Sequence, residues 1–244
     1  MIISFFEEFP NSENLEKLEL VDWDTKLYLA SKSLKEFHRI RRGIKNEHVR
    51  ELIYWPILKH DYYISPFSKR KNLEAIFNEI GDENVSVLLD AEWPLKKRVA
   101  LKEIFSFFGN RRLIRNFVLQ HNNIYVAEYY HMGAFMDAIY GFLGLHFDPN
   151  KFNNRAIRMV YHSLHNFDKN TINELRRCEE SYKDKFLVAY GTIARGILKN
   201  EPILPLSRLE EDLIIAKELG IREVVIYRLG GLNEDYARLL KQYA

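Results

Sequence analysis

The stretch Val85-Ser86-Val87-Leu88-Leu89-Asp90-Ala91-Glu92-Trp93-Pro94 decides how this chain is best interpreted. Its first half is a run of apolar, partly β-branched residues, which is typical of a strand buried on both faces of a parallel sheet. The run ends at two acids spaced i, i+2, and on a strand that spacing puts Asp90 and Glu92 on the same face. The stretch therefore predicts a buried parallel strand that ends in two carboxylates.

Short apolar segments of this kind alternate with amphipathic helical patterns from one end of the chain to the other. We expect strands at residues 2–6, 26–30, 51–55, 85–89, 124–127, 156–160, 186–190 and 223–227. Helical patterns fill the intervals, at 11–20, 33–42, 66–80, 95–108, 110–120 and 207–219, and a last helix opens at Asn233. Ser207 with Glu210 has the spacing of a capping box, and Gly220 is placed to stop the same helix.

Eight alternating strand and helix units predict right-handed parallel βαβ connections. Their number matches an α/β fold of the (β/α)8 TIM-barrel type, which we expect to form one domain over residues 1–244. The main rival is an open doubly wound sheet. No G-x-G-x-x-G motif follows the first strand, so the usual dinucleotide signature is absent from the sequence.

Composition limits the partners that this chain can attract. Of 244 residues, 36 are basic and 34 acidic, a net charge of +2 that gives no bulk attraction for nucleic acid or membrane, and we predict neither as a partner. The single cysteine, Cys178, excludes an intramolecular disulfide and cysteine-rich metal sites, and its helical context predicts a half-buried thiol. No signal peptide is visible, so we expect a cytoplasmic protein, without cofactor or metal and of open oligomeric state.

In barrel enzymes the chemistry lies at the carboxyl ends of the strands. In this sequence those ends carry acids, aromatic residues, a histidine and an arginine. The predicted catalytic residues are the acids Glu92, Asp90, Glu128 and Glu8. The predicted substrate-binding residues are Trp55, Tyr129, Tyr161, His162, Tyr190 and Arg228. Paired carboxylates divide acid and base roles in glycoside hydrolysis, and aromatic rings suit the apolar faces of sugars.

The motif Asp90-Ala91-Glu92-Trp93 after the fourth strand resembles the end of the chitinase-type (family 18) glycoside hydrolase signature. The resemblance implies that Glu92 is the general acid and that Asp90 orients the acetamido group of the substrate. Met159-Val160-Tyr161-His162 is similar to the Met-x-Tyr-Asp of that family, with histidine in place of aspartate. Leu88 and Val85 stand where the signature has further acids.

From these residues we expect a glycosidase-like barrel that hydrolyses or transfers a small carbohydrate ligand. Glu92 is predicted to donate the proton to the leaving oxygen, with Asp90 orienting or tuning it. Either Glu128 or Glu8 is predicted to be the nucleophile or base. Tyr161, Tyr190 and Arg228 are predicted to hold the substrate.

Three alternatives stay open. Arg228 beside Gly230-Gly231 fits an enzyme that binds a phosphosugar or phosphate ester, although Glu234 and Asp235 at the next helix would repel phosphate. A barrel without catalysis would serve as a binding module. In it the acids would be structural, with Glu128 paired to Arg112 or Arg115 and the Asp90–Glu92 pair bridged to Arg98. Basic stretches at residues 32–50 and 111–115 also fit RNA binding, which the balanced overall charge disfavours.

Overall fold

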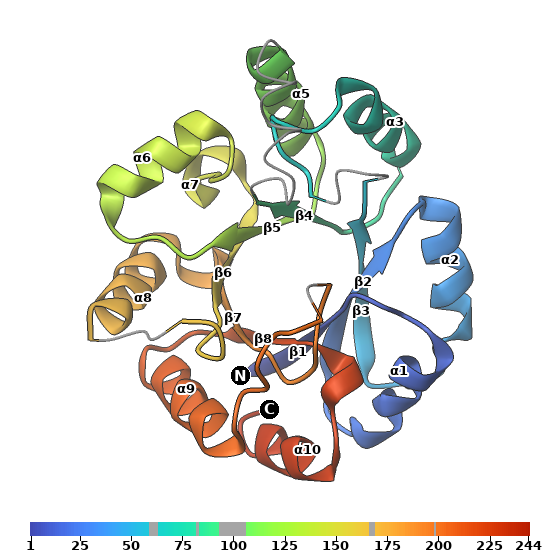
Figure 1. Cartoon of the computed structure of the whole chain (residues 1–244), viewed down its shortest axis with the longest axis vertical. Helices are drawn as coiled ribbons and strands as arrows, with labels where there is room; N and C mark the ends of the chain where they lie inside the picture. The colour runs from blue at the N-terminus through green and yellow to red at the C-terminus, as the bar shows by residue number, and fades with distance from the viewer. Residues whose placement is uncertain (59–62, 82, 93–105, 166–168, 198) are drawn as a thin grey trace.

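The structure is a computed structural model that describes residues 1–58, 63–81, 83–92, 106–165, 169–197 and 199–244. Eight parallel strands close into a barrel in the order of the chain. They are β1 (Ile2–Glu7), β2 (Thr25–Ser31), β3 (Val49–Pro56), β4 (Val87–Ala91), β5 (Ile124–Tyr129), β6 (Arg155–Val160), β7 (Phe186–Gly191) and β8 (Glu223–Tyr227). Pairing of β1 with β8, from Ile2 opposite Glu223 to Phe6 opposite Tyr227, completes the ring (Figure 1). The predicted (β/α)8 barrel is confirmed, and the open sheet is wrong.

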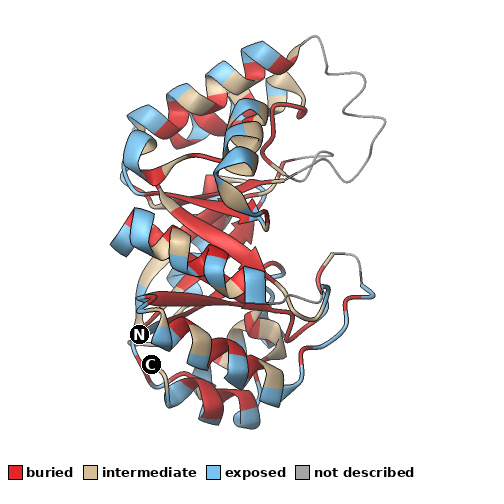
Figure 2. Cartoon of the chain, turned by 90° about the vertical axis from the view of Figure 1, so that its left-hand side faces the viewer, coloured by how far each residue is buried: buried red, intermediate tan, exposed pale blue. Residues whose placement is uncertain are grey.

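Helices surround the barrel on its outer side (Figure 1). They are α1 (Ser12–Glu16), α2 (Leu34–Gly43), α3 (Arg70–Ile80), α5 (Phe107–Gln120), α6 (Gly133–Leu143), α7 (Pro149–Phe152), α8 (Lys169–Tyr182), α9 (Leu206–Glu218) and α10 (Glu234–Lys241). Figure 2 shows buried strands between helices whose outer faces are exposed. The helix predicted at 95–108 lies mostly outside the described residues. No described helix is long and apolar enough to cross a membrane.

Two helix starts show how local chemistry sets the boundaries. Asn233 caps α10 as predicted, because its side-chain oxygen accepts from the backbone N–H groups of Asp235 and Tyr236 at 3.1 and 3.0 Å. The capping box predicted at Ser207 is wrong, since α9 begins one residue earlier, after Pro205. Proline presets the backbone torsion at that point, so the helix starts without a side-chain cap.

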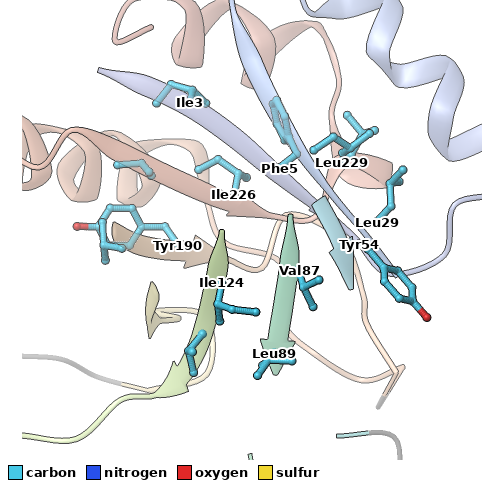
Figure 3. Close-up of a cluster of buried hydrophobic side chains, with 14 of the residues drawn as sticks. Ile3, Phe5, Leu29, Tyr54, Val87, Leu89, Ile124, Tyr190, Ile226 and Leu229 are labelled. Atoms are coloured by element: carbon cyan, nitrogen blue, oxygen red, sulfur yellow. The ribbon is translucent and has the colours of Figure 1, made fainter. Parts of the chain in front are cut away.

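Strand side chains alternate between two apolar clusters. Figure 3 shows part of the outer cluster, which fills the space between strands and helices and includes Val87, Leu89 and Ile226. The inner cluster fills the barrel and includes Phe6, Leu88 and Val225. Because neighbouring residues on a strand point to opposite faces, the direction of each polar residue at a strand end follows from this register.

A polar group closes the amino end of the barrel interior. Lys26 Nζ lies 2.8 Å from a Glu223 oxygen and 3.4 Å from a Glu51 oxygen. The hydroxyls of Ser4 and Tyr28 donate to the other Glu223 oxygen at 2.8 and 2.9 Å. Buried charges are stable only when they are paired and hydrogen-bonded, as they are here.

Candidate active site

A cavity of about 420 Å³ opens at the carboxyl ends of the strands. It is lined by Phe6, Glu8, Trp55, Tyr63, Leu88, Asp90, Glu92, Ala127, Tyr129, Tyr130, Met159, Tyr161, Leu164, His165, Ile197, Glu201 and Tyr227. Its floor belongs to the inner cluster, through Phe6, Trp55 and Leu88. Six of the ten predicted site residues therefore meet in one cavity: Glu8, Trp55, Asp90, Glu92, Tyr129 and Tyr161.

Asp90 and Glu92 reach this cavity because they share the inward direction of Leu88. Burial raises the pKa of Asp90 well above its ordinary value, and the charges of Glu92 and Glu8 raise it further, against a hydrogen bond from Trp55. Within the described part of the chain, the buried Oδ1 atom of Asp90 has no hydrogen-bond partner. A buried carboxyl oxygen without a partner favours the protonated form and offers a contact to a ligand.

Glu92 is less enclosed than Asp90. Burial raises its pKa to about 7, a hydrogen bond from Tyr63 lowers it, and the charge of Glu8 raises it. A carboxyl group with this pKa holds its proton in about half of the molecules at neutral pH, which suits a general acid.

Glu8 approaches from the opposite side of the ring, at the end of β1. The Tyr227 hydroxyl donates a hydrogen bond to Glu8 Oε2. Burial raises the pKa of Glu8 to about 7 against this hydrogen bond and the more distant charge of Arg228. Glu8, Asp90 and Glu92 thus enter the cavity from two sides, and each has a raised pKa. A fourth carboxyl group, that of Glu201, also lines the cavity.

Aromatic residues form the wall above these acids. Tyr161 and Tyr227 lie with ring centroids 5.6 Å apart. The Tyr129 hydroxyl lies 3.2 Å from His165 Nε2, so this pair closes part of the rim. Such rings can pack against the apolar faces of a sugar while their hydroxyls contact its polar edge.

Glu128 does not line the cavity, because it points to the outer side of β5. His146 Nδ1 lies 2.8 Å from Glu128 Oε2, and the Phe147 backbone N–H donates to Oε1 at 3.0 Å. The buried Arg158 guanidinium lies 3.6 Å away. Against the penalty of burial, these partners lower the pKa of Glu128. Glu128 is therefore paired, as the alternative of a structural acid predicted, but its partners are His146 and Arg158 and not Arg112 or Arg115.

Arg228 also lies outside the cavity, where it forms an ion pair with Glu7. Its Nη1 atom lies 3.0 Å from Glu7 Oε1, and the Gly230 backbone N–H donates to Oε2 at 2.8 Å. The donors considered for a phosphate group therefore bind a carboxylate of the chain itself. Arg98, the other considered partner for the mouth acids, lies outside the described residues.

His162 and Tyr190 complete the set of predicted residues that point away from the cavity. His162 Nδ1 lies 2.8 Å from a buried Asp212 oxygen. Tyr190 is buried in the outer cluster. Both lie between the barrel and its helices. Trp93, the last residue of the resembling motif, lies outside the described residues.

Tyr63 and Glu201 are among the cavity residues that the sequence did not predict. Tyr63 lies in the segment after β3, and Glu201 lies between β7 and α9. Neither follows a strand end directly, and position relative to strand ends was the signal used. Cys178 was predicted half-buried, but it is fully buried in α8, and burial raises its pKa to about 12.

Three residues outside the cavity have the spacing of a metal site, namely His131, Asp137 and His146. Asp137 already pairs with two guanidinium groups, at 2.6 Å from Arg177 and 3.6 Å from Arg158. Two fixed cations repel a metal ion, so we assign this group to charge pairing.

No protein family and no curated protein sequence matches this chain. Among solved structures it is similar to the glycoside hydrolase domain of PgaB (BpsB) from Bordetella bronchiseptica, with a TM-score of 0.58 at 10% identity, covering 99% of this chain and 98% of that one. The chain has the fold of chitinase-type glycoside hydrolases. A class V chitinase from Pseudomonas fluorescens Pf-5 gives a TM-score of 0.59 at 8% identity, covering 99% of each chain. The spore cortex-lytic enzyme SleL from Bacillus cereus gives 0.61 at 9% identity, covering 99% of this chain and 73% of that one. These likenesses confirm the expected glycosidase-like barrel as a fold.

Proposed function

We propose that this chain hydrolyses or transfers a glycosidic bond in the cavity at the carboxyl end of the barrel. The observation that carries the proposal is the meeting of Asp90, Glu92 and Glu8 in one aromatic-walled cavity. Carboxyl groups in different environments divide the acid and base roles of glycoside chemistry. The fold shared with chitinases supports the same chemistry by analogy.

Glu92 is the proposed proton donor to the leaving oxygen. Its pKa of about 7 keeps a proton available near neutral pH, and Tyr63 fixes its orientation through a hydrogen bond. Asp90, two residues earlier on the same face, contacts the substrate through the Oδ1 atom, which has no hydrogen-bond partner among the residues that the structure describes. The resemblance to family 18 implies that this contact is to an acetamido group.

Glu8 is the proposed base or nucleophile across the cavity. The hydrogen bond from Tyr227 stabilises its ionised form and holds its position. In this proposal Glu128, Arg228 and His162 support the scaffold, because their polar contacts lie behind the strands. Tyr190 supports it by packing in the outer cluster. Tyr161, Tyr129 and Trp55 hold the sugar.

The phosphate-ester alternative receives less support. The Arg228 guanidinium and the Gly230 N–H that would bind phosphate are occupied by Glu7. The proposal includes a cytoplasmic location, for which the support is the single cysteine.

The test is turnover of a panel of chromogenic glycosides, chito-oligosaccharides and phosphate esters by the wild type and by Glu92→Gln. We expect glycoside turnover that falls by roughly 10²–10⁴-fold in the variant, because a general acid contributes about that much. Glu83→Gln is the matched control, since Glu83 is exposed and precedes the same strand. Glycoside turnover that survives in Glu92→Gln contradicts the assignment. Sugar binding by calorimetry without any turnover would favour a binding module instead.

A further inference from the structure

A helix on the outside of a barrel usually buries its apolar side chains against the strands, but helix α6 does not. It has no buried residue, although its sequence Gly-Ala-Phe-Met-Asp-Ala-Ile-Tyr-Gly-Phe-Leu contains a single charged side chain. That charge, Asp137, faces the barrel and pairs with Arg177 and Arg158. Tyr140 stacks on the buried His131 ring at 4.4 Å. Asp137 and Tyr140 thus attach α6 to the barrel. Met136, Ile139 and Leu143 are half-buried, and Phe135 and Phe142 are exposed to solvent.

The exposed side chains of α6 and its neighbours are large. Phe135 is 77% exposed, Phe142 55%, and Met132, just before the helix, 47%. Phe135 and Phe142 are seven residues apart, which places them on one side of the helix. Phe108 at the start of α5 is 68% exposed, and Phe107 contacts both Phe108 and Phe142. We call Phe108, Met132, Phe135 and Phe142 the α6 apolar surface.

A second cavity, of about 530 Å³, lies beside this surface between α5, α6, α7 and α8. In Figure 1 α6 occupies the ring of helices between α5 and α8. Ala134, Asp137, Ala138 and Gly141 form its α6 wall, and Arg111 and Arg115 enter it from α5. The apolar surface and the two arginines are therefore contiguous.

These two arginines lack acidic partners within the part of the chain that the structure describes. Arg111 packs on the Phe142 ring at 5.5 Å and Arg115 on the Phe152 ring at 4.9 Å. Burial and the neighbouring charge of Arg115 lower the pKa of Arg111, and its buried Nε has no hydrogen-bond partner. Two like charges four residues apart on one helix repel each other, so this arrangement costs stability and leaves anion-binding capacity unused.

We propose that the α6 apolar surface and the Arg111–Arg115 pair form a docking surface for a membrane that contains anionic lipids. Exposed aromatic and methionine side chains enter the interface between headgroups and acyl chains, and adjacent arginines bind the phosphates. A second copy of the chain fits less well, because a two-fold interface through this surface places the arginine pairs of both copies together.

The test is flotation of the full chain with vesicles of phosphatidylcholine alone or of phosphatidylcholine mixed with phosphatidylglycerol. We expect binding to the mixed vesicles that weakens as salt is added. Phe135→Ser with Phe142→Ser should reduce the partition coefficient at least tenfold, since each buried ring contributes strongly. Arg111→Gln with Arg115→Gln should reduce it about fivefold for each charge removed.

Matched controls distinguish binding through this surface from nonspecific binding to vesicles. Ile203→Ser with Ile214→Ser removes two exposed apolar residues elsewhere, and Arg41→Gln with Arg42→Gln removes two exposed charges of α2. Both control pairs should bind vesicles as the wild type does. Failure of the wild type to float, or equal loss in the controls, overturns the proposal. A dimer in light scattering that Phe135→Ser and Phe142→Ser dissociate also overturns it, in favour of a second copy.

Discussion

Carboxylates on the two faces of the same barrel end have opposite surroundings. Inside, Glu8, Asp90 and Glu92 face one another and aromatic rings, and burial raises the pKa of each. Outside, Glu7, Glu128 and Asp212 have basic partners instead: Arg228 for Glu7, His146 and Arg158 for Glu128, and His162 and Arg208 for Asp212. Burial raises the pKa of Glu7 and Asp212 as well, so the partners and not burial distinguish the two faces.

The contrast is sharpest where the two faces share a strand. Glu7 and Glu8 are neighbours in sequence, yet Glu7 accepts from Arg228 and Gly230 while Glu8 lines the cavity. Side-chain direction, rather than residue type or position along the barrel axis, decides whether an acid here stabilises the scaffold or remains available for chemistry.

The largest expected effect comes from breaking an outside pair. Glu128→Gln removes the anion that the buried Arg158 and His146 share, leaves Arg158 only the Asp137 carboxylate at 3.6 Å, and should lower the free energy of unfolding by about 3–5 kcal/mol. The pKa of Glu128 is lowered in the fold, so its contribution is present above its ordinary value of 4.5 and disappears as the pH falls below it. Urea denaturation at pH 7 and at low pH checks both statements. An unchanged stability at pH 7 would remove the distinction between the two faces.

An inside substitution of the same kind should act in the opposite direction. The pKa of Glu8 is raised from 4.5 to about 7, so the fold favours its protonated form, and wild-type stability declines between those pH values. Glu8→Gln keeps an acceptor for Tyr227 and should raise the free energy of unfolding at pH 8 by about 1–3 kcal/mol, with little change at pH 5. The same denaturation series measures this. A loss of stability at pH 8 would contradict it.

The smallest effect concerns the hydrogen bond that moderates Glu8. Tyr227→Phe removes the hydroxyl that lowers the pKa of this carboxyl, so the pKa should rise, by about one unit or less. A carbon-13 NMR titration of the Glu8 carboxyl measures the shift directly. A lower pKa in Tyr227→Phe would show that the hydroxyl does not stabilise the ionised form.

Much of the barrel was predictable because each buried parallel strand is a short apolar run in the sequence. The β8 segment was predicted at its observed bounds, and β1 and β2 within one residue at each end. The β4 strand begins two residues later than predicted, because Val85 and Ser86 continue an apolar pattern without joining the strand. Apolar periodicity marks burial, and burial extends beyond the hydrogen-bonded ladder.

The site was predictable only where strand parity could be read. Glu8 is two residues after Phe6, a spacing that predicts the same direction, and the structure places both on the inner face. Glu128 and Tyr190 lie one residue out of phase with Ala127 and Ala189 of the inner cluster. Loop residues such as Tyr63 and Glu201 carry no periodic signal, so only the tertiary structure brings them to the cavity.

Overall charge was a poor guide to local surfaces. A balanced total of +2 hides a helix that turns its one acid inward and an arginine pair without acidic partners among the described residues. A prediction of partners from the net charge of the whole chain therefore misses local surfaces of this kind.

The polar group of Lys26, Glu51 and Glu223 and the inner cluster above it block passage of a ligand along the barrel axis. The barrel is a cup rather than a tube, because side chains fill it below the cavity floor. A polymeric ligand would have to lie across the rim instead of threading along the axis. Whatever enters the cup also leaves by its mouth, so release of one fragment would precede arrival of the next.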